Sequence, residues 1–285
     1  MPLAARQGKT KESRVCDPRY VRSTPTFLDD LILPAQCHED LTNQQRSDRV
    51  LRHSVTVNLD WWNQRLTDLE LPGTPVTGTN ASGLPVTGGA AQVSRAQLFS
   101  LGGPVVEDGE AALRLLWHVL AWGTGTSARQ CRRRLASVAA APSDTTALLR
   151  ESAETARRDP GVAYGLLCPG GRRYAIKYFG AAFFTKYLHF AGAGHPQHRA
   201  LILDDRVAEA LRRLCGWGSL RTGGYWPATT YDRYCALLAR WAEEESDALG
   251  RLVCPDEIER WLFDHGRPAL RSPVGQSHKP HLPRS

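Results

Sequence analysis

A lysine and an aspartate, 18 residues apart, are the side chains in this sequence best placed for chemistry. Lys186 is followed by the largely apolar residues 187–190, and partial removal from water disfavours the charged form of an amine, which makes it a candidate nucleophile. Asp204 follows the apolar residues 201–203 and is predicted to cap the next helix, with its carboxylate toward the cleft beside the lysine segment. The spacing therefore predicts an amine and a carboxylate in one cleft.

Ordinary structural roles for both residues stay open at this stage. Aspartate is a common helix N-cap, and a single lysine on an amphipathic helix is usually a solvated charge. Asp205 also competes with Asp204 for any catalytic role.

The segment from Tyr174 to Val207 must position the pair. Its pattern predicts a helix that breaks at Gly180, resumes by Thr185 and runs through Phe190, followed by a turn at 192–196. The backbone N–H groups of a tight turn at a helix N-terminus can hold a phosphate without any charged side chain.

The rest of the chain from residue 94 is predicted to be helical, and the central and C-terminal two-thirds to form an all-α domain. Ser127 is the expected cap of the second helix, as Asp60 is for an earlier helix that contains two tryptophans. Residues 72–91, with five Gly, three Pro, four Thr and no charge, predict a flexible linker or long loop. The helices expected after residue 94 span 111–122, 128–140, 145–158, 205–214, 230–249 and 255–264.

The net charge of +7 is distributed unevenly along the 285 residues. The predicted tails, 1–23 and 266–285, carry +4 each, and residues 111–221 carry +10 between two acidic flanks. A basic centre is compatible with a polyanionic partner, although a solvated surface is the more common origin of such a bias.

Composition narrows the remaining classes. The hydrophobic fraction of 42% excludes disorder throughout, and no apolar run reaches the roughly 18 residues of a membrane span. The charged N-terminus does not resemble a signal peptide, so we expect a cytoplasmic, nucleoid-associated protein with no membrane partner. Seven cysteines without a CxxC pair indicate neither a disulfide framework nor a thiolate metal site, and we expect no metal and no cofactor.

These motifs resemble the helix-hairpin-helix DNA glycosylases, in particular the 8-oxoguanine glycosylases and similar actinobacterial proteins. The hairpin, Lys186, an apolar helix and Asp204 carry the resemblance, together with Trp117–Trp122 and the following Gly-Thr-Gly-Thr loop. It covers roughly residues 111–265. The resemblance implies a mainly α helix-hairpin-helix domain there, preceded by an accessory region at 24–110.

The resemblance also implies a function. Such a protein would act as a monomer on double-stranded DNA that contains a damaged base, flip the nucleotide into a pocket and release an oxidised purine, most plausibly 8-oxoguanine. Lys186 would attack the sugar C1′ and form a Schiff base that permits strand cleavage, and Asp204 would stabilise positive charge on the sugar. The similar positions expected to bind DNA are Gly180, Ala182, Phe184, Thr185, Thr124, Gly125, Arg129 and Arg133, and those expected in the base pocket are Phe190, Tyr225 and Trp226.

Two departures from the family pattern affect these expectations. The usual hairpin has the pattern Leu-x-Gly-x-Gly-x-Lys, whereas residues 179–186 contain one glycine, so its geometry and its phosphate binding must differ. The wedge loop at 123–126 also lacks asparagine. A non-catalytic DNA-binding protein of the same fold is the first alternative, and a helical interaction protein without a DNA role is the second.

Overall fold

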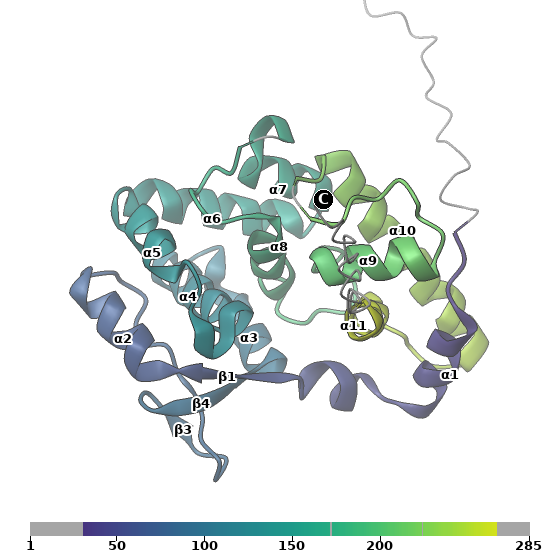
Figure 1. Ribbon diagram of the computed structural model, residues 1–285, viewed down its shortest axis with the longest axis horizontal. Helices are drawn as coiled ribbons and strands as arrows, with labels where there is room; N and C mark the ends of the chain where they lie inside the picture. The colour runs from purple at the N-terminus through teal and green to yellow at the C-terminus, as the bar shows by residue number, and fades with distance from the viewer. Residues whose placement is uncertain (1–30, 172, 224, 267–285) are drawn as a thin grey trace, which may run out of the picture.

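The computed structural model describes residues 31–171, 173–223 and 225–266, and it is mainly α-helical with one small sheet (Figure 1). The sheet and α2 lie at one end of the molecule, and α1 lies at the other end near α11. The α-helices are α1 (Ala35–Asn43), α2 (Leu59–Asp68), α3 (Arg95–Gly102), α4 (Gly109–Thr124), α5 (Cys131–Ala139), α6 (Pro142–Ala156), α7 (Pro160–Leu167), α8 (Ala181–Phe190), α9 (Asp205–Leu214), α10 (Ala228–Leu249) and α11 (Pro255–His265).

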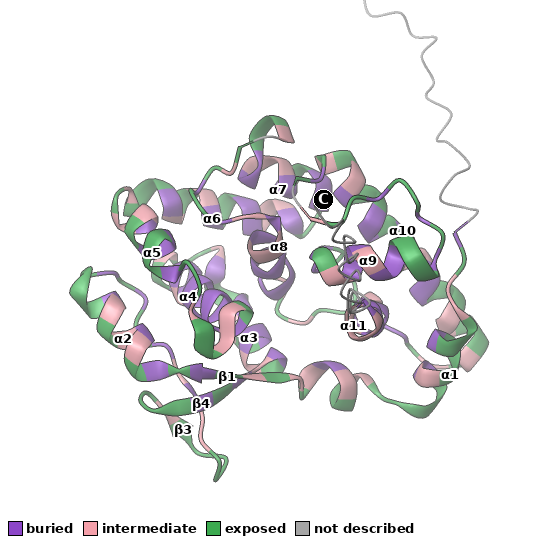
Figure 2. Ribbon diagram, viewed as in Figure 1, coloured by how far each residue is buried: buried purple, intermediate pink, exposed green. Residues whose placement is uncertain are grey.

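Two helices form the centre of the core. In α4, every residue from Ala111 to Trp122 except Arg114 is buried, and α3, α6 and α8 pack around it. In α8, eight of the ten residues are buried (Figure 2). An apolar helix that is covered on all sides loses nearly all contact with water, and this burial is the main source of its stability. These two helices therefore provide a rigid frame for Lys186.

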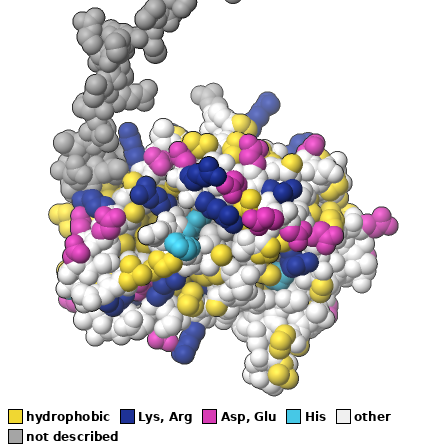
Figure 3. All heavy atoms as spheres, turned by 180° about the vertical axis from the view of Figure 1, so that it is seen from behind, with side chains coloured by type: hydrophobic (Ala, Val, Ile, Leu, Met, Phe, Trp, Pro, Cys, Tyr) yellow, Lys and Arg dark blue, Asp and Glu magenta, His cyan; other side chains and the backbone are white. Residues whose placement is uncertain are grey.

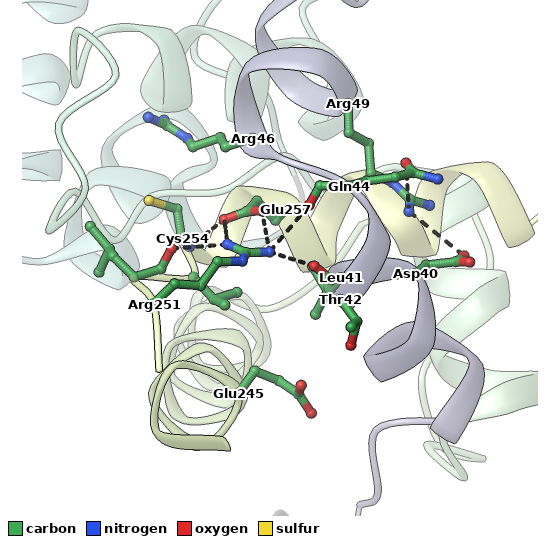
Figure 4. A network of polar contacts seen from close by, with 12 residues as sticks. Asp40, Leu41, Thr42, Gln44, Arg46, Arg49, Glu245, Arg251, Cys254 and Glu257 are labelled. Carbon is green, nitrogen blue, oxygen red and sulfur yellow. Dashed lines mark hydrogen bonds and ion pairs between the residues drawn. The ribbon is translucent and has the colours of Figure 1, made fainter. Parts of the chain in front are cut away.

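The N-terminal segment is tied to the C-terminal helices by a polar network (Figure 4). The π-helical turn η2 (Ser47–Leu51) and α1 pack against α11. Arg251, just after α10, donates to the Leu41 carbonyl at 2.7 Å and pairs with Glu257 of α11 at 3.2 Å. On the same side, Arg46 pairs with Asp256 at 2.7 Å.

The segment at 72–91, predicted to be a flexible linker or a long loop, is a mostly irregular segment that contains two short strands. It forms β2 (Gly78–Thr79) and β3 (Pro85–Val86) and leads into β4 (Ala90–Ser94), which pairs antiparallel with β1 (Ser54–Asn58) in the strand order β1-β4-β2-β3. Asn63 of α2 exchanges hydrogen bonds with the backbone of Val76 at 2.7 and 2.9 Å. Contacts from distant elements thus fix a sequence that has little order of its own.

Two of the three predicted helix caps, Asp60 and Ser127, are wrong. The helix with the tryptophan pair starts two residues earlier, at Leu59, and its cap is Asn58, which accepts from the Trp61 amide at 3.0 Å. Asp60 instead accepts from the Gly89 amide at 2.9 Å. Ser127 does not cap α5, because residues 125–127 form the 3-10 turn η4 (Gly125–Ser127) and its hydroxyl donates back to Thr124.

The expected helix from Tyr174 and the tight hairpin within 179–186 are also wrong. After α7 and the short turn η5 (Pro169–Gly171), the described residues from 173 to 180 contain no helix. α8 then runs without interruption from Ala181, and the extended backbone of Gly180 provides its N-cap. Lys186 therefore lies in the second turn of one continuous helix.

The mainly α fold is confirmed, and the six helices listed from the sequence after residue 94 are present with ends shifted by up to three residues. The turn at 192–196 and the cap at Asp204 are also found. Within the described residues, six cysteines are free thiols and all are buried. The predicted tails lie outside the described residues, apart from Gly266.

Candidate active site

Lys186 is almost completely buried in the core of the molecule, with 7% of its surface exposed. Its Nζ atom donates to Asp204 Oδ2 at 3.0 Å and to the Ala182 carbonyl, one turn back in α8, at 2.7 Å. The side chain therefore bends toward the N-terminal end of its helix. A buried cation in this position needs both acceptors, because it has lost most of its water.

Asp204 holds the other half of the pair at the start of α9. Its Oδ1 atom accepts from the amides of Arg206 at 3.1 Å and Val207 at 3.2 Å, so it caps the helix with one oxygen. Oδ2 is left for Lys186. Capping and ion pairing use different oxygens, and the orientation of the carboxylate is fixed from two sides.

The segment before Asp204 is held by hydroxyl groups from two other helices. Tyr231 of α10 both accepts from the Leu201 amide at 3.1 Å and donates to its carbonyl at 2.8 Å. Thr185, next to Lys186, bonds the amide of Leu203 at 3.2 Å. Residues 201–203 are therefore held in the core, and they position Asp204 next to Lys186.

Burial of the Asp204 carboxyl works against ionisation, but the Lys186 ammonium and the amides of Val207 and Arg206 outweigh it and lower the pKa of Asp204 below its ordinary value. A carboxyl with a depressed pKa stabilises the fold fully above its unfolded pKa, about 3.9, and this stabilisation is lost as pH falls toward the folded pKa. The carboxylate is therefore charged at neutral pH.

We expect this linkage to be visible in unfolding. The difference in the free energy of unfolding between the wild type and Asp204→Asn should be constant from pH 7 to about 5 and should shrink below about pH 4. Urea unfolding followed by circular dichroism at a series of pH values measures it. A difference that grows on acidification would mean that the folded pKa of Asp204 is raised rather than lowered.

Asp205, the competing acid, is exposed, in contrast to its buried neighbour Asp204. Lys186 forms its hydrogen bond with Asp204 and not with Asp205. Partial burial and the adjacent Asp204 charge raise the pKa of the Asp205 carboxyl. The geometry thus assigns the contact with the lysine to Asp204, as the sequence predicted, while the chemical role of both residues stays a prediction.

Four residues near the predicted hairpin were expected to bind DNA; two of them contribute backbone groups at the start of α8, and the other two have buried side chains. The Ala182 carbonyl accepts from Lys186, and Gly180 caps α8. Phe184 and Thr185 are fully buried, and the Thr185 hydroxyl is used by Ala181 and Leu203. The side chains of Phe184 and Thr185 are therefore not accessible to DNA in this structure.

The residues expected in the wedge lie between α4 and α5. Thr124 ends α4, where its hydroxyl donates to the Leu120 carbonyl, and Gly125 follows with φ of +57°. Arg129 and Arg133 are exposed, and the described residues offer neither of them a carboxylate partner. Gly123 lies directly against α8, because a Cβ there would come within 2.8 Å of the Phe183 ring.

The three residues expected to form one base pocket do not share a cavity. Phe190 is fully buried and packs edge-on against Trp122 at 5.6 Å. Tyr225 and Trp226 instead line an open pocket of about 780 Å³ above the first turn of α8. Tyr225 is 43% exposed, whereas Trp226 is buried and donates to the Arg221 carbonyl.

A buried ion pair beside the site had no signal in the sequence. Arg95 of α3 and Glu259 of α11 are 1% and 0% exposed and form two hydrogen bonds, the shorter 2.6 Å. The Arg95 guanidinium lies 5.5 Å from the Trp122 ring. The sequence predicted that Glu259 lies in a helix. It did not predict the partner, because Arg95 is 164 residues away in the chain.

We expect Glu259→Gln to lower the free energy of unfolding by about 3–5 kcal/mol, because it leaves the Arg95 charge buried without its counter-ion. The exposed pair between Arg212 and Glu209 is the control, and Glu209→Gln should cost less than about 1 kcal/mol. Chemical denaturation of both variants makes the comparison. Equal costs would show that the buried pair does not carry this energy.

Several hydrogen-bond donors around Arg95 and Trp122 have no partner. Arg95 Nε, Trp122 Nε1 and Arg260 Nε are buried and unpaired within the described chain, as is the His53 Nδ1 atom. The His53 ring lies 5.3 Å from Trp122. Burial, reinforced by Arg95, lowers the pKa of His53 to about 3, so its imidazole is neutral at pH 7. Unpaired buried donors are uncommon in folded proteins.

Two further properties concern the described residues only. None of their helices is long and apolar enough to cross a membrane. In the same part of the chain, no group of three or more His, Cys, Asp or Glu side chains is arranged to hold a metal ion.

The comparisons with known proteins give one match. A family model described as "Putative 8-oxoguanine DNA glycosylase OGG-like protein" matches residues 48–263, which include α2 to α8, the Lys186–Asp204 pair and most of α11. No curated protein matches the chain, and no solved structure does.

Proposed function

We propose that the chain, which belongs to the OGG-like family, removes an oxidised purine, 8-oxoguanine, from double-stranded DNA. Membership implies DNA binding and a glycosylase type of function. The observation that supports the specific reaction is the buried hydrogen bond between Lys186 Nζ and Asp204 Oδ2, at 3.0 Å. The chemistry of this amine and this carboxylate supports a separate role for each residue.

In this proposal Asp204 stabilises positive charge on the sugar, and Lys186 is the nucleophile. As the bond between C1′ and the base nitrogen breaks, its electron pair leaves with the base, and the sugar gains positive charge that the Asp204 carboxylate stabilises. The Lys186 ammonium first gives a proton to the departing base and neutralises it, and the free amine then bonds to C1′ and releases a second proton to solvent. Opening of the sugar ring then yields a Schiff base, from which β-elimination cleaves the strand.

The distribution of unpaired positive charge supports a DNA-binding surface near this pair. Most described arginines outside residues 129–134 and 173 bond a carboxylate or a carbonyl, and on the face seen in Figure 3 basic and acidic side chains are interspersed. By contrast, Arg129, Arg132, Arg133, Arg173 and Lys177 have exposed side chains and no ion-pair partner among the described residues. Cations without internal partners are available to phosphates.

We expect Arg133→Ala to weaken binding to duplexes of any sequence to a similar extent. Loss of one phosphate contact should also reduce the slope of log affinity against log salt by about 1. Fluorescence anisotropy between 50 and 300 mM salt provides the measurement. Arg212→Ala, which removes an arginine already paired with Glu209, is the control and should leave the slope unchanged.

Base release from a set of duplexes tests the proposed function. The full chain is incubated with DNA that contains 8-oxoguanine, uracil, 3-methyladenine or no lesion, and the free base is quantified. We expect release of 8-oxoguanine above all others. Salt-dependent binding without any release would support the alternative of a non-catalytic DNA-binding protein, and failure to bind at any salt concentration would support a role unrelated to DNA.

A further inference from the structure

The open pocket of about 780 Å³ above the start of α8 is separate from the catalytic pair, since neither Lys186 nor Asp204 lines it. Its floor is formed by the first turn of α8, and its walls come from residues 173–178 and 225–226. The volume lies within the range of pockets that hold small organic ligands. A single phosphate group would leave most of it empty.

One wall of the pocket is a pair of stacked tyrosines. The rings of Tyr174 and Tyr225 are 4.6 Å apart with 23° between their planes, and Tyr225 keeps 43% of its surface exposed. Gly180 permits this arrangement, because a Cβ there would come within 3.2 Å of the Tyr174 ring. One face of Tyr225 is thus covered by Tyr174, and a third planar ring can continue the stack.

Positive charge surrounds the same pocket. Arg173 and Lys177 are exposed and form no ion pair among the described residues. Arg134, which also lines it, is 7% exposed, donates to the carbonyls of Tyr178 and Arg129 and to a thiol, and lies 4.1 Å from the centre of the Phe183 ring. It forms no ion pair with a carboxylate in the part of the chain that the structure describes. Asp205 is the one acid among the lining residues, against three cations.

We infer that this pocket binds a nucleotide of single-stranded DNA, with its unstacked base on Tyr225 and its phosphates at Lys177 and Arg173. Aromatic rings beside unpaired cations are the combination that holds single strands, because every base has a face to stack and every linkage has a charge. A base inside an intact duplex is already stacked and cannot reach Tyr225. The inference goes beyond the proposed function, because it requires no base excision.

Two labelled probes with equal charge test the inference. One is a hexamer of thymidine nucleotides, and the other has the same phosphates but abasic sugar analogues. Stacking of one base is worth about 1–3 kcal/mol, so the wild type should bind the thymidine hexamer about 5 to 150 times more tightly. Tyr225→Ala should remove this preference, whereas Tyr225→Phe should retain it. Lys177→Gln should weaken both probes by the same factor.

The controls separate this result from a general loss of structure or activity. Leu252→Ala changes an exposed apolar side chain that lies outside the pocket, and it should leave both affinities unchanged. The preference should also persist in Asp204→Asn, so a failed glycosylase assay would not remove it. Equal binding of the two probes by the wild type, or a preference that survives Tyr225→Ala, would overturn the inference.

Discussion

Lys186→Gln should abolish the covalent adduct that borohydride traps between the protein and an 8-oxoguanine duplex. Reduction captures a Schiff base, and an amide nitrogen cannot form one. Glutamine is chosen because it retains donors for Asp204 and the Ala182 carbonyl, the two acceptors that Lys186 bonds at 3.0 and 2.7 Å. Alanine would instead leave the Asp204 carboxylate without its partner and destabilise the core.

Base release should fall on the order of 10³-fold in the same variant, because the nucleophile is lost while the carboxylate remains. Lys186→Arg provides a second comparison, since arginine keeps the positive charge beside Asp204 but is not a nucleophile at neutral pH. Gel detection of the trapped complex and single-turnover base release are measured on the same preparations. An adduct of normal yield in Lys186→Gln would assign the nucleophile to another residue.

Asp204→Asn should lower single-turnover base release by about 10²–10³-fold, with little change in duplex affinity. Asparagine is as good an N-cap as aspartate, so the amides of Arg206 and Val207 keep their acceptor. What is lost is the negative charge, which the proposal places beside the positively charged sugar. The effect should therefore appear in the chemical step, as measured by rapid quench under excess enzyme.

Asp108→Asn is the matched control for this substitution. Asp108 caps α4 in the same way, through the Glu110 amide at 2.8 Å, but it is exposed and lies outside the site. Its replacement should leave base release unchanged. Similar losses in Asp108→Asn and Asp204→Asn would show that helix capping, rather than charge, underlies the effect.

The sequence predicted the central contact because its cause is local. An apolar triplet at 201–203 must be buried, so the residue after it is delivered to the core, and an aspartate there caps the next helix. This local reasoning did not by itself separate Asp204 from Asp205, which the structure shows to be exposed. Helix periodicity was equally informative for α4, because a continuous apolar run predicts a helix covered on all sides.

The errors arose where distant contacts decide the structure. The Gly, Pro and Thr residues at 72–91 have no strong preference, and their order comes from Asn63 and from pairing with β4. The Arg95–Glu259 pair joins helices far apart in the chain, and no spacing rule identifies such partners. The base pocket was misassembled for the same reason, since Phe190 lies at the C-terminal end of α8, whereas Tyr225 lies beside its first turn.

Peptide mapping of the borohydride-trapped complex tests the central claim most directly. The full chain is reacted with an 8-oxoguanine duplex in the presence of borohydride, digested with nuclease and protease, and examined by mass spectrometry. The account predicts one modified peptide from α8, with the reduced sugar remnant on Lys186. A remnant on any other amine, or release of 8-oxoguanine without any trapped species, would contradict the role of Lys186 as the nucleophile.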